Sequence, residues 1–400
     1  MKHKTRTCLI RLSDEEMLTL DTKSSFLGKN KSALIRDAAL SYWADSRLIN
    51  GDKLLKIYQD GDDSKEQIIN LIFQYLRRHG YPHNKLNPTS LNKTMNTIAR
   101  TKSPLLDDDN LQRNTVGLNL ANYFHPHMVT VRCLKKYLSP QQLFDDDVLL
   151  KDAIKRWLDL GNKPNLAGMR RILRTRDGTR SVVNFKPAIS KFIYDTYAPA
   201  NGRILDPCAG YGGRLAGCIA SNKGLHYHGI DPDGRTATGN MKMAAFFSKQ
   251  YDMMSQREWK FGFSFDLGCA EDVMIGLGDE KYDLVFSSPP YFGVEQYSNE
   301  INQSYLRYPE YDQWRESFLK KVLVESFRVL RNGGVLVWNV KDYKKMKIAE
   351  DSCKICLNVG FVLEKVFQMH LSNSEYRRGV DHEKKWHTEP IFVFRKSRAN

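Results

Sequence analysis

The sequence contains no apolar run that could cross a membrane and no hydrophobic segment of the kind that marks a secretory signal. A transmembrane helix needs roughly 18–20 largely uncharged residues in a row, and no stretch of the chain approaches this length. The N-terminal MKHKTRTCLIRLSDEE is basic but lacks the apolar core of a signal peptide. Internal repeats and low-complexity tracts are also absent. These absences predict a cytoplasmic protein.

Cysteine is scarce, and no group of cysteines and histidines has the spacing of a metal site. The seven cysteines are odd in number and scattered, as is typical of reduced thiols in the cytosol. Cys353 and Cys356 form a CxxC, but within an amphipathic helix pattern and without a second pair. His125, His127 and Cys133 lack an evident fourth ligand, and a His-Pro-His turn is as well explained by packing. We therefore predict no metal.

Positive charge is abundant. The 400 residues include 61 Lys and Arg against 46 Asp and Glu, a formal charge of +15. Such an excess favours a polyanionic partner, above all nucleic acid. The 41% hydrophobic content is ample for buried cores, and the length suggests two or three domains.

The first 48 residues have the pattern of a small strand–helix–helix unit. Residues 4–12 alternate like a strand, and Ser13 with Glu16 forms a capping box for a helix that Gly28 ends. A second amphipathic helix follows. So small a unit buries little surface alone, which favours a homodimer through residues 1–48.

IRLSDEE and LGKNKSALIRDAAL in this segment resemble the ribbon-helix-helix family of DNA-binding dimers. The resemblance implies that paired strands enter the major groove and that Thr7, Leu9 and Arg11 face the DNA. Leu9 departs from the pattern because it offers only an apolar contact, for example to a thymine methyl. A pure dimerisation module and an unrelated small helical hairpin are the alternative interpretations.

Residues 49–180 are predicted to be helical and to take part in target recognition. SKEQIINLIFQYLRRHGYP is an amphipathic helix pattern that ends at Gly80. The arginine-rich RRILRTRDGTR, residues 170–180, suits contact with phosphates.

From residue 181 onward, strands alternate with helices in the order of a parallel α/β sheet. GRILDPCAGYGGR reads as a strand, a glycine loop and a helix start, an arrangement that allows the backbone to approach a ligand. The loop lacks the GK[ST] of a phosphate loop, and the acidic Asp206 disfavours a polyphosphate. About 25 residues later Asp231 ends a second strand, where a carboxylate can accept both ribose hydroxyls. Glu271 and Asp272 end a third strand.

A fourth strand runs directly into Ser-Ser-Pro-Pro-Tyr at residues 287–291. The order DPCAGYGGR, GIDPD, CAEDV, SPPY, RVLRNGG and a terminal strand pair resembles class I S-adenosylmethionine-dependent methyltransferases over about residues 181–397. SPPY is similar to the [DNS]PP[YFW] of the DNA amino-methyltransferases. The resemblance implies an α/β fold: a Rossmann-like, doubly wound, mostly parallel sheet with an antiparallel terminal strand at 181–400. An α-rich N-terminal region and the small ribbon-helix-helix-like module would precede it.

The resemblance implies S-adenosyl-L-methionine as cofactor and assigns its contacts. Asp206 would lie near the methionine end, Asp231 at the ribose, and Glu271 and Asp272 at the adenine edge. Cys269 stands where relatives often have Asp, so which carboxylate meets the adenine stays open. The full set of implied contacts is Asn184, Phe185, Lys186, Pro187, Asp206, Pro207, Ala209, Gly210, Gly212, Asp231, Glu271 and Asp272.

We call the segment Ser288–Tyr291 the elbow, and its residues suit the chemistry of methyl transfer to an amino group. The lone pair of an exocyclic amino nitrogen is delocalised into the base, so acceptors for both of its N–H groups make it more nucleophilic. Ser288 Oγ and the carbonyl of Pro289 are suitable acceptors, with Pro290 keeping the backbone rigid. Tyr291 offers a ring for stacking on a flipped base. No cysteine stands at this strand end, which argues against C5-cytosine methylation; Cys208 lies on the glycine loop instead.

Serine at the first motif position favours N4-cytosine as the target, with N6-adenine a close second. Target contacts are predicted from residues 1–180 and from a basic loop, 372–388, that contains Arg377, Arg378, Lys384 and Lys385. Glu295 and Tyr297 would lie near the pocket mouth. An RNA amino-methyltransferase and a DNA-binding regulator with an inactive methyltransferase half are the alternatives. A companion restriction endonuclease would be consistent with the main hypothesis, although the sequence identifies none.

Overall fold

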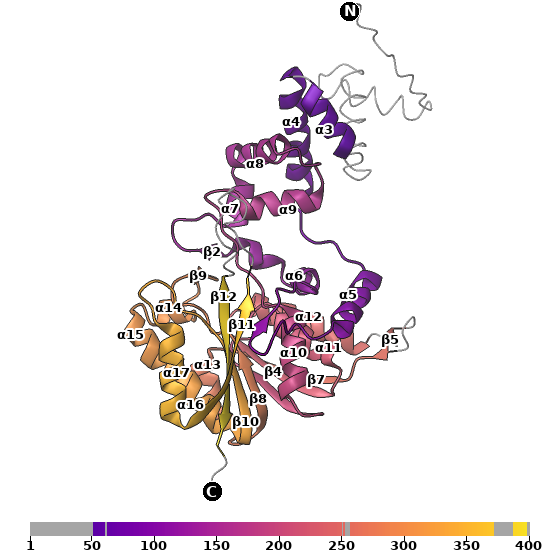
Figure 1. Ribbon diagram of the computed structural model, residues 1–400. Coiled ribbons are helices and arrows are strands. Elements are labelled where there is room, and N and C mark those ends of the chain that lie inside the picture. The colour runs from indigo at the N-terminus through magenta and orange to yellow at the C-terminus, as the bar shows by residue number, and fades with distance from the viewer. Residues whose placement is uncertain (1–50, 61, 250, 253–256, 372–386, 398–400) are drawn as a thin grey trace, which may run out of the picture. The chain divides into compact units, whose positions relative to one another are not determined.

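The computed structural model describes residues 51–60, 62–249, 251–252, 257–371 and 387–397 (Figure 1). Thr7, Leu9 and Arg11 of the predicted N-terminal module lie outside these residues, as do Arg377, Arg378, Lys384 and Lys385 of the predicted basic loop. The chain forms two compact units, one from residues 1–82 and 143–176, the other from 83–142 and 177–400. Residues 83–142 thus belong with the sheet, and the functional regions 1–48, 49–180 and 181–400 remain predictions.

The first unit is helical among its described residues. Its helices are α3 (Gly51–Asp60), α4 (Asp62–His79), α8 (Asp147–Asp159) and α9 (Leu166–Thr175), and α7 (Pro140–Asp145) spans its boundary. The helix predicted to end at Gly80 is confirmed, since α4 stops at His79 and Gly80 has φ +76°. The side chain of Asp146 caps α8 by accepting a hydrogen bond from the Leu149 amide. Among the described residues, no helix of either unit is long and apolar enough to span a bilayer.

The second unit is built on a twisted sheet. In spatial order its strands are β1 (Asn110–Leu111), β11 (Phe361–His370), β12 (Thr388–Lys396), β10 (Leu330–Asn339), β8 (Tyr282–Ser287), β3 (Arg203–Asp206), β4 (Leu225–Asp231) and β7 (Phe261–Leu267). The five strands from β10 to β7 run parallel, whereas β12 is antiparallel to both of its neighbours. The chain moves outward from β3 to β7 and then returns to β8 on the other side of β3. The predicted fold class, a Rossmann-like doubly wound sheet with an antiparallel terminal strand, is confirmed.

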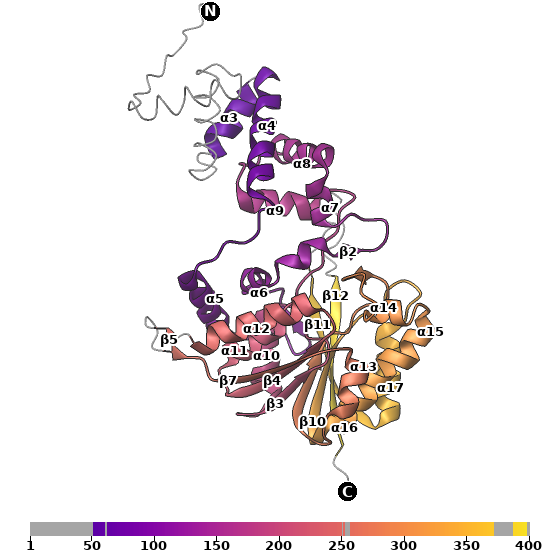
Figure 2. The ribbon, with the colours of Figure 1, turned by 180° about the vertical axis from the view of Figure 1, so that it is seen from behind.

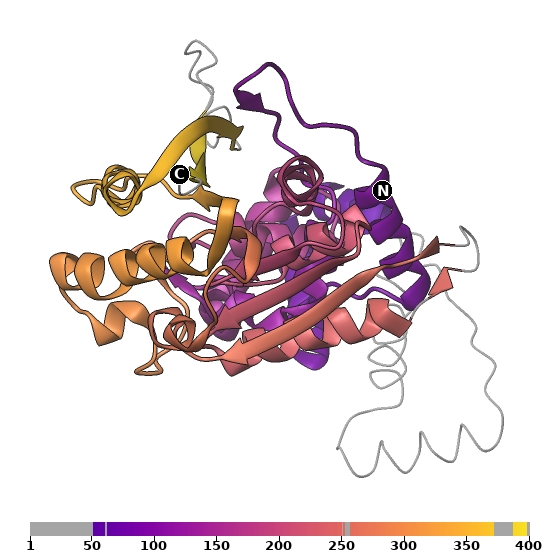
Figure 3. The ribbon, with the colours of Figure 1, turned by 90° about the horizontal axis from the view of Figure 1, so that it is seen from below.

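Helices cover both faces of this sheet (Figures 2 and 3). One face packs against α5 (Pro88–Arg100), α6 (Leu118–Phe124), α10 (Pro187–Tyr197), α11 (Gly213–Ser221) and α12 (Gly234–Lys249). The other packs against α13 (Ala270–Val273), α16 (Lys320–Val329) and α17 (Ile348–Val359). Residues of β8 alternate between the two cores: Leu284 and Phe286 enter the first, Val285 the second. Both faces of β8 are therefore buried, which explains its continuous apolar run.

Short elements complete the second unit. Two ribbons pair β2 (Arg132–Cys133) with β9 (Glu295–Gln296), and β5 (Tyr251–Asp252) with β6 (Arg257–Glu258). The short helices α14 (Ser304–Arg307) and α15 (Tyr311–Trp314) precede a π-helical turn at Arg315–Leu319, and 3-10 turns lie at Pro126–Thr130 and Met274–Gly276. The pairing of β2 with β9 brings a segment from before the sheet to the chain that follows Ser-Pro-Pro-Tyr.

Candidate active site

A cavity of about 600 Å³ opens at the carboxyl ends of the parallel strands. This edge, beside the point where the strand order reverses between β3 and β8, is where open α/β sheets bind ligands. Most of the predicted site residues line the cavity: Asn184, Phe185, Lys186, Pro207, Ala209, Gly210, Asp231, Glu271, Ser288, Pro289, Pro290 and Tyr291. Pro187, Asp206, Gly212 and Asp272 do not line it. The structure thus brings together the glycine loop, two of the predicted acids and the proline elbow.

At Gly212 and Gly213 the glycine loop is packed too closely to accept a side chain. Gly212 has φ +72°, and a Cβ on Gly213 would lie 2.0 Å from the carbonyl oxygen of Phe185. Asn184, beside Phe185, donates from Nδ2 to the carbonyl of Tyr211 at 2.7 Å. The segment before β3, which contains the implied cofactor contacts Asn184 and Phe185, therefore lies directly on the loop.

Asp206, at the end of β3, is the centre of a buried polar network. Arg214 donates to both of its oxygens, at 2.7 and 3.1 Å, and the Tyr227 and Ser287 hydroxyls donate at 2.6 and 2.7 Å. Ser287 also accepts the amide N–H of Cys208 at 3.1 Å. The Asp206 carboxylate is fully buried and its oxygens are occupied by protein donors. It ties the glycine loop to the proline elbow, while the role predicted for it at the methionine end stays a prediction.

Asp231, at the end of β4, presents its carboxylate to the cavity. Its oxygens accept the amide N–H groups of Gly210 and Asp233, both at 3.0 Å. Burial raises the pKa of this carboxyl to about 7, although both amides favour the charged form. The two oxygens keep lone pairs for further donors, so the site can accept a pair of hydroxyl groups.

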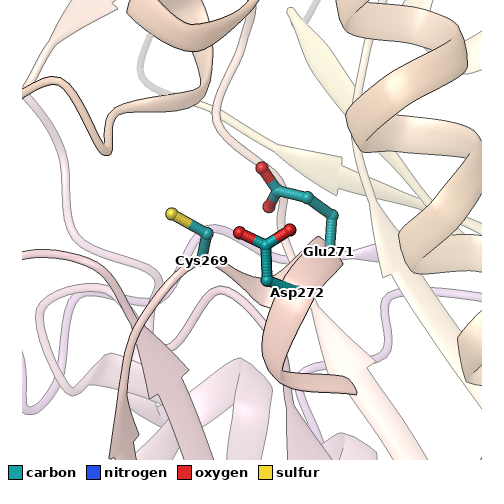
Figure 4. Close-up of side chains that lie close together, drawn as sticks. All are labelled: Cys269, Glu271 and Asp272. Atoms are coloured by element: carbon teal, nitrogen blue, oxygen red, sulfur yellow. The ribbon is translucent and has the colours of Figure 1, made fainter. Parts of the chain in front are cut away.

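Cys269, Glu271 and Asp272 lie close together after β7 (Figure 4). Their ligand atoms are within 4.8 Å of one another, as in a metal site. However, Arg307 Nη1 lies 2.6 Å from Glu271 and 2.7 Å from Asp272, and Cys269 Sγ contacts the Asn302 carbonyl. The Arg307 guanidinium already bridges both carboxylates, so this cluster does not by itself indicate a metal.

The two acids of this cluster differ in position. Glu271 is buried and lines the cavity, and burial raises the pKa of its carboxyl. Asp272 is exposed and turns toward Arg307 outside the cavity lining. On geometry, Glu271 is the better placed of the two for the adenine edge, the question that the sequence leaves open.

The proline elbow follows β8, and its tyrosine is held by a residue that the sequence motifs did not identify. The Tyr291 hydroxyl donates to the carboxylate of Glu389, which stands near the start of β12 and also lines the cavity. Burial raises the pKa of Tyr291 well above its usual value, so the phenol stays protonated. The antiparallel direction of β12 could have pointed to Glu389, because it places the first residues of β12 at the carboxyl ends of the neighbouring strands.

The β2–β9 ribbon forms another wall. Leu134 donates its amide N–H to the Val294 carbonyl at 2.7 Å, and the Tyr297 hydroxyl donates to Glu295. Glu295 and Tyr297 both line the cavity, together with Cys133. Burial raises the pKa of the Glu295 carboxyl. Their predicted placement near the pocket thus agrees with the geometry.

The two histidines that precede this ribbon, His125 and His127, pack against neighbouring residues and do not form a set of metal ligands. His127 Nε2 lies 3.2 Å from the Thr236 hydroxyl, and burial lowers the pKa of its ring to about 4. His125 is fully buried, and a Cβ on Gly239 would lie 2.5 Å from its ring. Neither histidine belongs to a metal-like group among the described residues.

A family model matches the C-terminal part of the chain. Residues 282–400 match the family model N6_N4_Mtase, described as DNA methylase; the match begins at β8 and includes the proline elbow. None of the curated proteins matches the chain.

Several solved structures match part of the chain. A SAM-dependent methyltransferase from Methanosarcina mazei is 13% identical with a TM-score of 0.33, covering 52% of this chain and 98% of its own. A methyltransferase from Pyrococcus furiosus is 16% identical with a TM-score of 0.34, covering 53% and 83%. A SAM-dependent O-methyltransferase from Thermotoga maritima is 14% identical with a TM-score of 0.35, covering 60% and 74%. The fold class itself rests on the strand order of the sheet.

Proposed function

We propose that this protein transfers a methyl group from S-adenosylmethionine to an exocyclic amino group of a base flipped out of DNA. The observation that carries the proposal is the shared cavity: the glycine loop with Asp231 and the elbow Ser288–Tyr291 open into one space. The match of residues 282–400 to a DNA methylase family supports DNA as the substrate.

The described residues fit the proposed cofactor. The volume of the cavity and the glycine loop that lines it suit a nucleoside-sized ligand. Asp231 would accept the ribose hydroxyls, and Glu271 would meet the adenine edge. When bound, S-adenosylmethionine supplies a methyl group already activated by its sulfonium.

The protein's own task is to position and polarise the amino group. Ser288 Oγ and the Pro289 carbonyl would each accept one N–H, which directs the nitrogen lone pair toward the methyl group. Neither group needs to form a covalent bond to the base. Tyr291 would stack on the base, with its ring orientation fixed by Glu389.

We propose N4 of cytosine as the preferred target, with N6 of adenine next. The support is Ser288 at the first position of the motif, where a neutral hydroxyl replaces the acid or amide of related motifs. Residues 1–48 and the basic loop would contribute DNA contacts, so deletion of residues 1–48 should lower the salt dependence of DNA binding.

The test is methyl transfer from labelled S-adenosylmethionine to duplex DNA, single-stranded DNA and tRNA, followed by nucleoside analysis. We expect label in N4-methylcytosine of duplex DNA. Label confined to RNA, or no label in any nucleic acid, would contradict the proposal.

Variants of the elbow test the assigned roles. Ser288→Ala and Tyr291→Ala should each lower the turnover number by about 10²-fold or more while calorimetry shows unchanged cofactor affinity. Ser248→Ala is the matched control, because Ser248 is exposed on α12 and does not line the cavity. Unchanged turnover in both elbow variants would refute the mechanism.

A further inference from the structure

Three cationic side chains, Lys186, Arg113 and Lys341, line the cavity. Arg113 and Lys341 both act electrostatically on Lys186, so the three lie near one another, and we call the part of the cavity that they line the cationic wall. Lys186 is only 6% exposed, and the hydrogen-bond partner of its ammonium is the sulfur of Met369 at 3.6 Å. A thioether sulfur is a weak acceptor, so among the described residues this buried ammonium has no strong hydrogen-bond acceptor.

No carboxylate lies within 4.0 Å of these three cations among the residues that the structure describes. Burial lowers the pKa of Lys186; Glu389 opposes this, whereas Arg113 and Lys341 add to it. Glu389, the nearby acid, already accepts the hydroxyl of Tyr291. Burial of an unpaired charge is costly, which suggests that the site is built to receive an anion.

The position of the wall indicates which anion. Met369 lies on β11 and Glu389 on β12, beyond β10 in the sheet order β11-β12-β10-β8-β3. The glycine loop and Asp231 follow β3 and β4, on the other side of the elbow. The ammonium of Lys186 therefore shares its surroundings with Tyr291, on the side where the target base would enter.

We propose that Lys186, Arg113 and Lys341 form a phosphate subsite that holds the DNA backbone next to the flipped nucleotide. The inference rests on the proposed function and deepens it, since it moves Lys186 from the cofactor contacts implied by its motif to the substrate. Phosphate on this wall would complete the charge balance and fix the sugar of the target nucleotide while Tyr291 stacks on its base.

The experiment measures binding of a fluorescent DNA duplex by anisotropy between 50 and 300 mM salt, the order of range over which phosphate contacts are resolved. Lys186→Met, Arg113→Gln and Lys341→Gln should each reduce the slope of log K against log salt by about 0.9, and weaken binding roughly eightfold at 0.1 M. Lys186→Arg, which keeps the charge, should retain the wild-type slope. Lys242→Gln is the control, because Lys242 is exposed on α12 and does not line the cavity.

The anion on this wall could be a DNA phosphate or the carboxylate of the cofactor. Calorimetry with S-adenosylhomocysteine separates these two sources. Wild-type slopes in all three neutralised variants would overturn the subsite, and a loss confined to S-adenosylhomocysteine affinity would assign the anion to the cofactor carboxylate instead. Arg113 and Lys341 are exposed and half-buried, so their variants remain informative if Lys186→Met does not fold. Reduced slopes in a protein that methylates no DNA would support the subsite while refuting the proposed reaction.

Discussion

Replacement of Arg214 by Met should destabilise the protein strongly, because it would leave the Asp206 carboxylate buried without its cation. Asp206 is 0% exposed and Arg214 is 4% exposed, and two hydrogen bonds join them. Burial alone would lower the pKa of Arg214, yet Asp206 raises it above the ordinary value, so the pair is held in its charged form. Met preserves the length of the side-chain stem and removes the charge.

The size of the effect follows from what Asp206 retains. Removal of one partner from a buried ion pair costs about 3–5 kcal/mol. Because the Tyr227 and Ser287 hydroxyls still donate to the carboxylate, we expect the lower end, about 3 kcal/mol. For a unit made of residues 83–142 and 177–400, an unfolding entropy of about 2.1 cal/mol/K per residue makes this a fall in melting temperature of about 5 °C.

A double-mutant cycle measured by scanning calorimetry tests this reasoning. Asp206→Asn should also destabilise the protein, since Arg214 would then be the unpaired charge. The double variant should be more stable than the two separate losses predict, by about 1.5 kcal/mol or more. Additive losses would refute the pair as a unit. If Asp206→Asn left the melting temperature unchanged but abolished cofactor binding, Asp206 would instead act directly on the cofactor.

Three further predictions concern the cavity. Cofactor affinity should fall about tenfold per unit as pH drops below about 7, because protonation removes the Asp231 carboxylate whose pKa burial has raised to about 7; calorimetry across pH 5.5–8.5 checks this, and an equal dependence in Asp231→Asn would contradict it. Gly213→Ala should abolish cofactor binding, since its Cβ would lie 2.0 Å from a carbonyl oxygen, whereas Gly276→Ala, with nothing within 4 Å, should not. Tyr291→Phe and Glu389→Ala should each lower turnover about five- to tenfold, the worth of one hydrogen bond, and the double variant no further; a multiplied loss would show that the two act separately.

The order of the main strands along the chain was predictable because apolar runs alternate with helix patterns and because their motifs follow the order seen in class I methyltransferases. The apolar run before Ser288 and the first strand of the predicted terminal pair correspond to β8 and β11. The glycine loop and Asp231 could be placed by the same logic, since carboxyl ends of parallel strands share one edge. Sequence spacing was sufficient to bring Gly210, Asp231 and Ser288 to one cavity.

Other parts of the site depend on contacts that leave no periodic signal. β1, β2 and β9 have two residues each, too few for alternation to be visible. Their partners lie far along the chain: β1 pairs with β11, and β2 with β9. Glu389 reads as an ordinary polar residue at the start of a strand, and only the pairing of β12 with its neighbours brings it to Tyr291.

The two serines of the elbow illustrate how a short motif divides its work. Ser288 lines the cavity, where its hydroxyl is available to a substrate. Ser287 is fully buried, donates to Asp206 and accepts from Cys208, so it links the elbow to the glycine loop. A shift of the glycine loop on cofactor binding would therefore be transmitted to the elbow through the hydroxyl group of Ser287. The sequence marks Ser288 by its motif, whereas the role of Ser287 follows only from the folded arrangement of β3 beside β8.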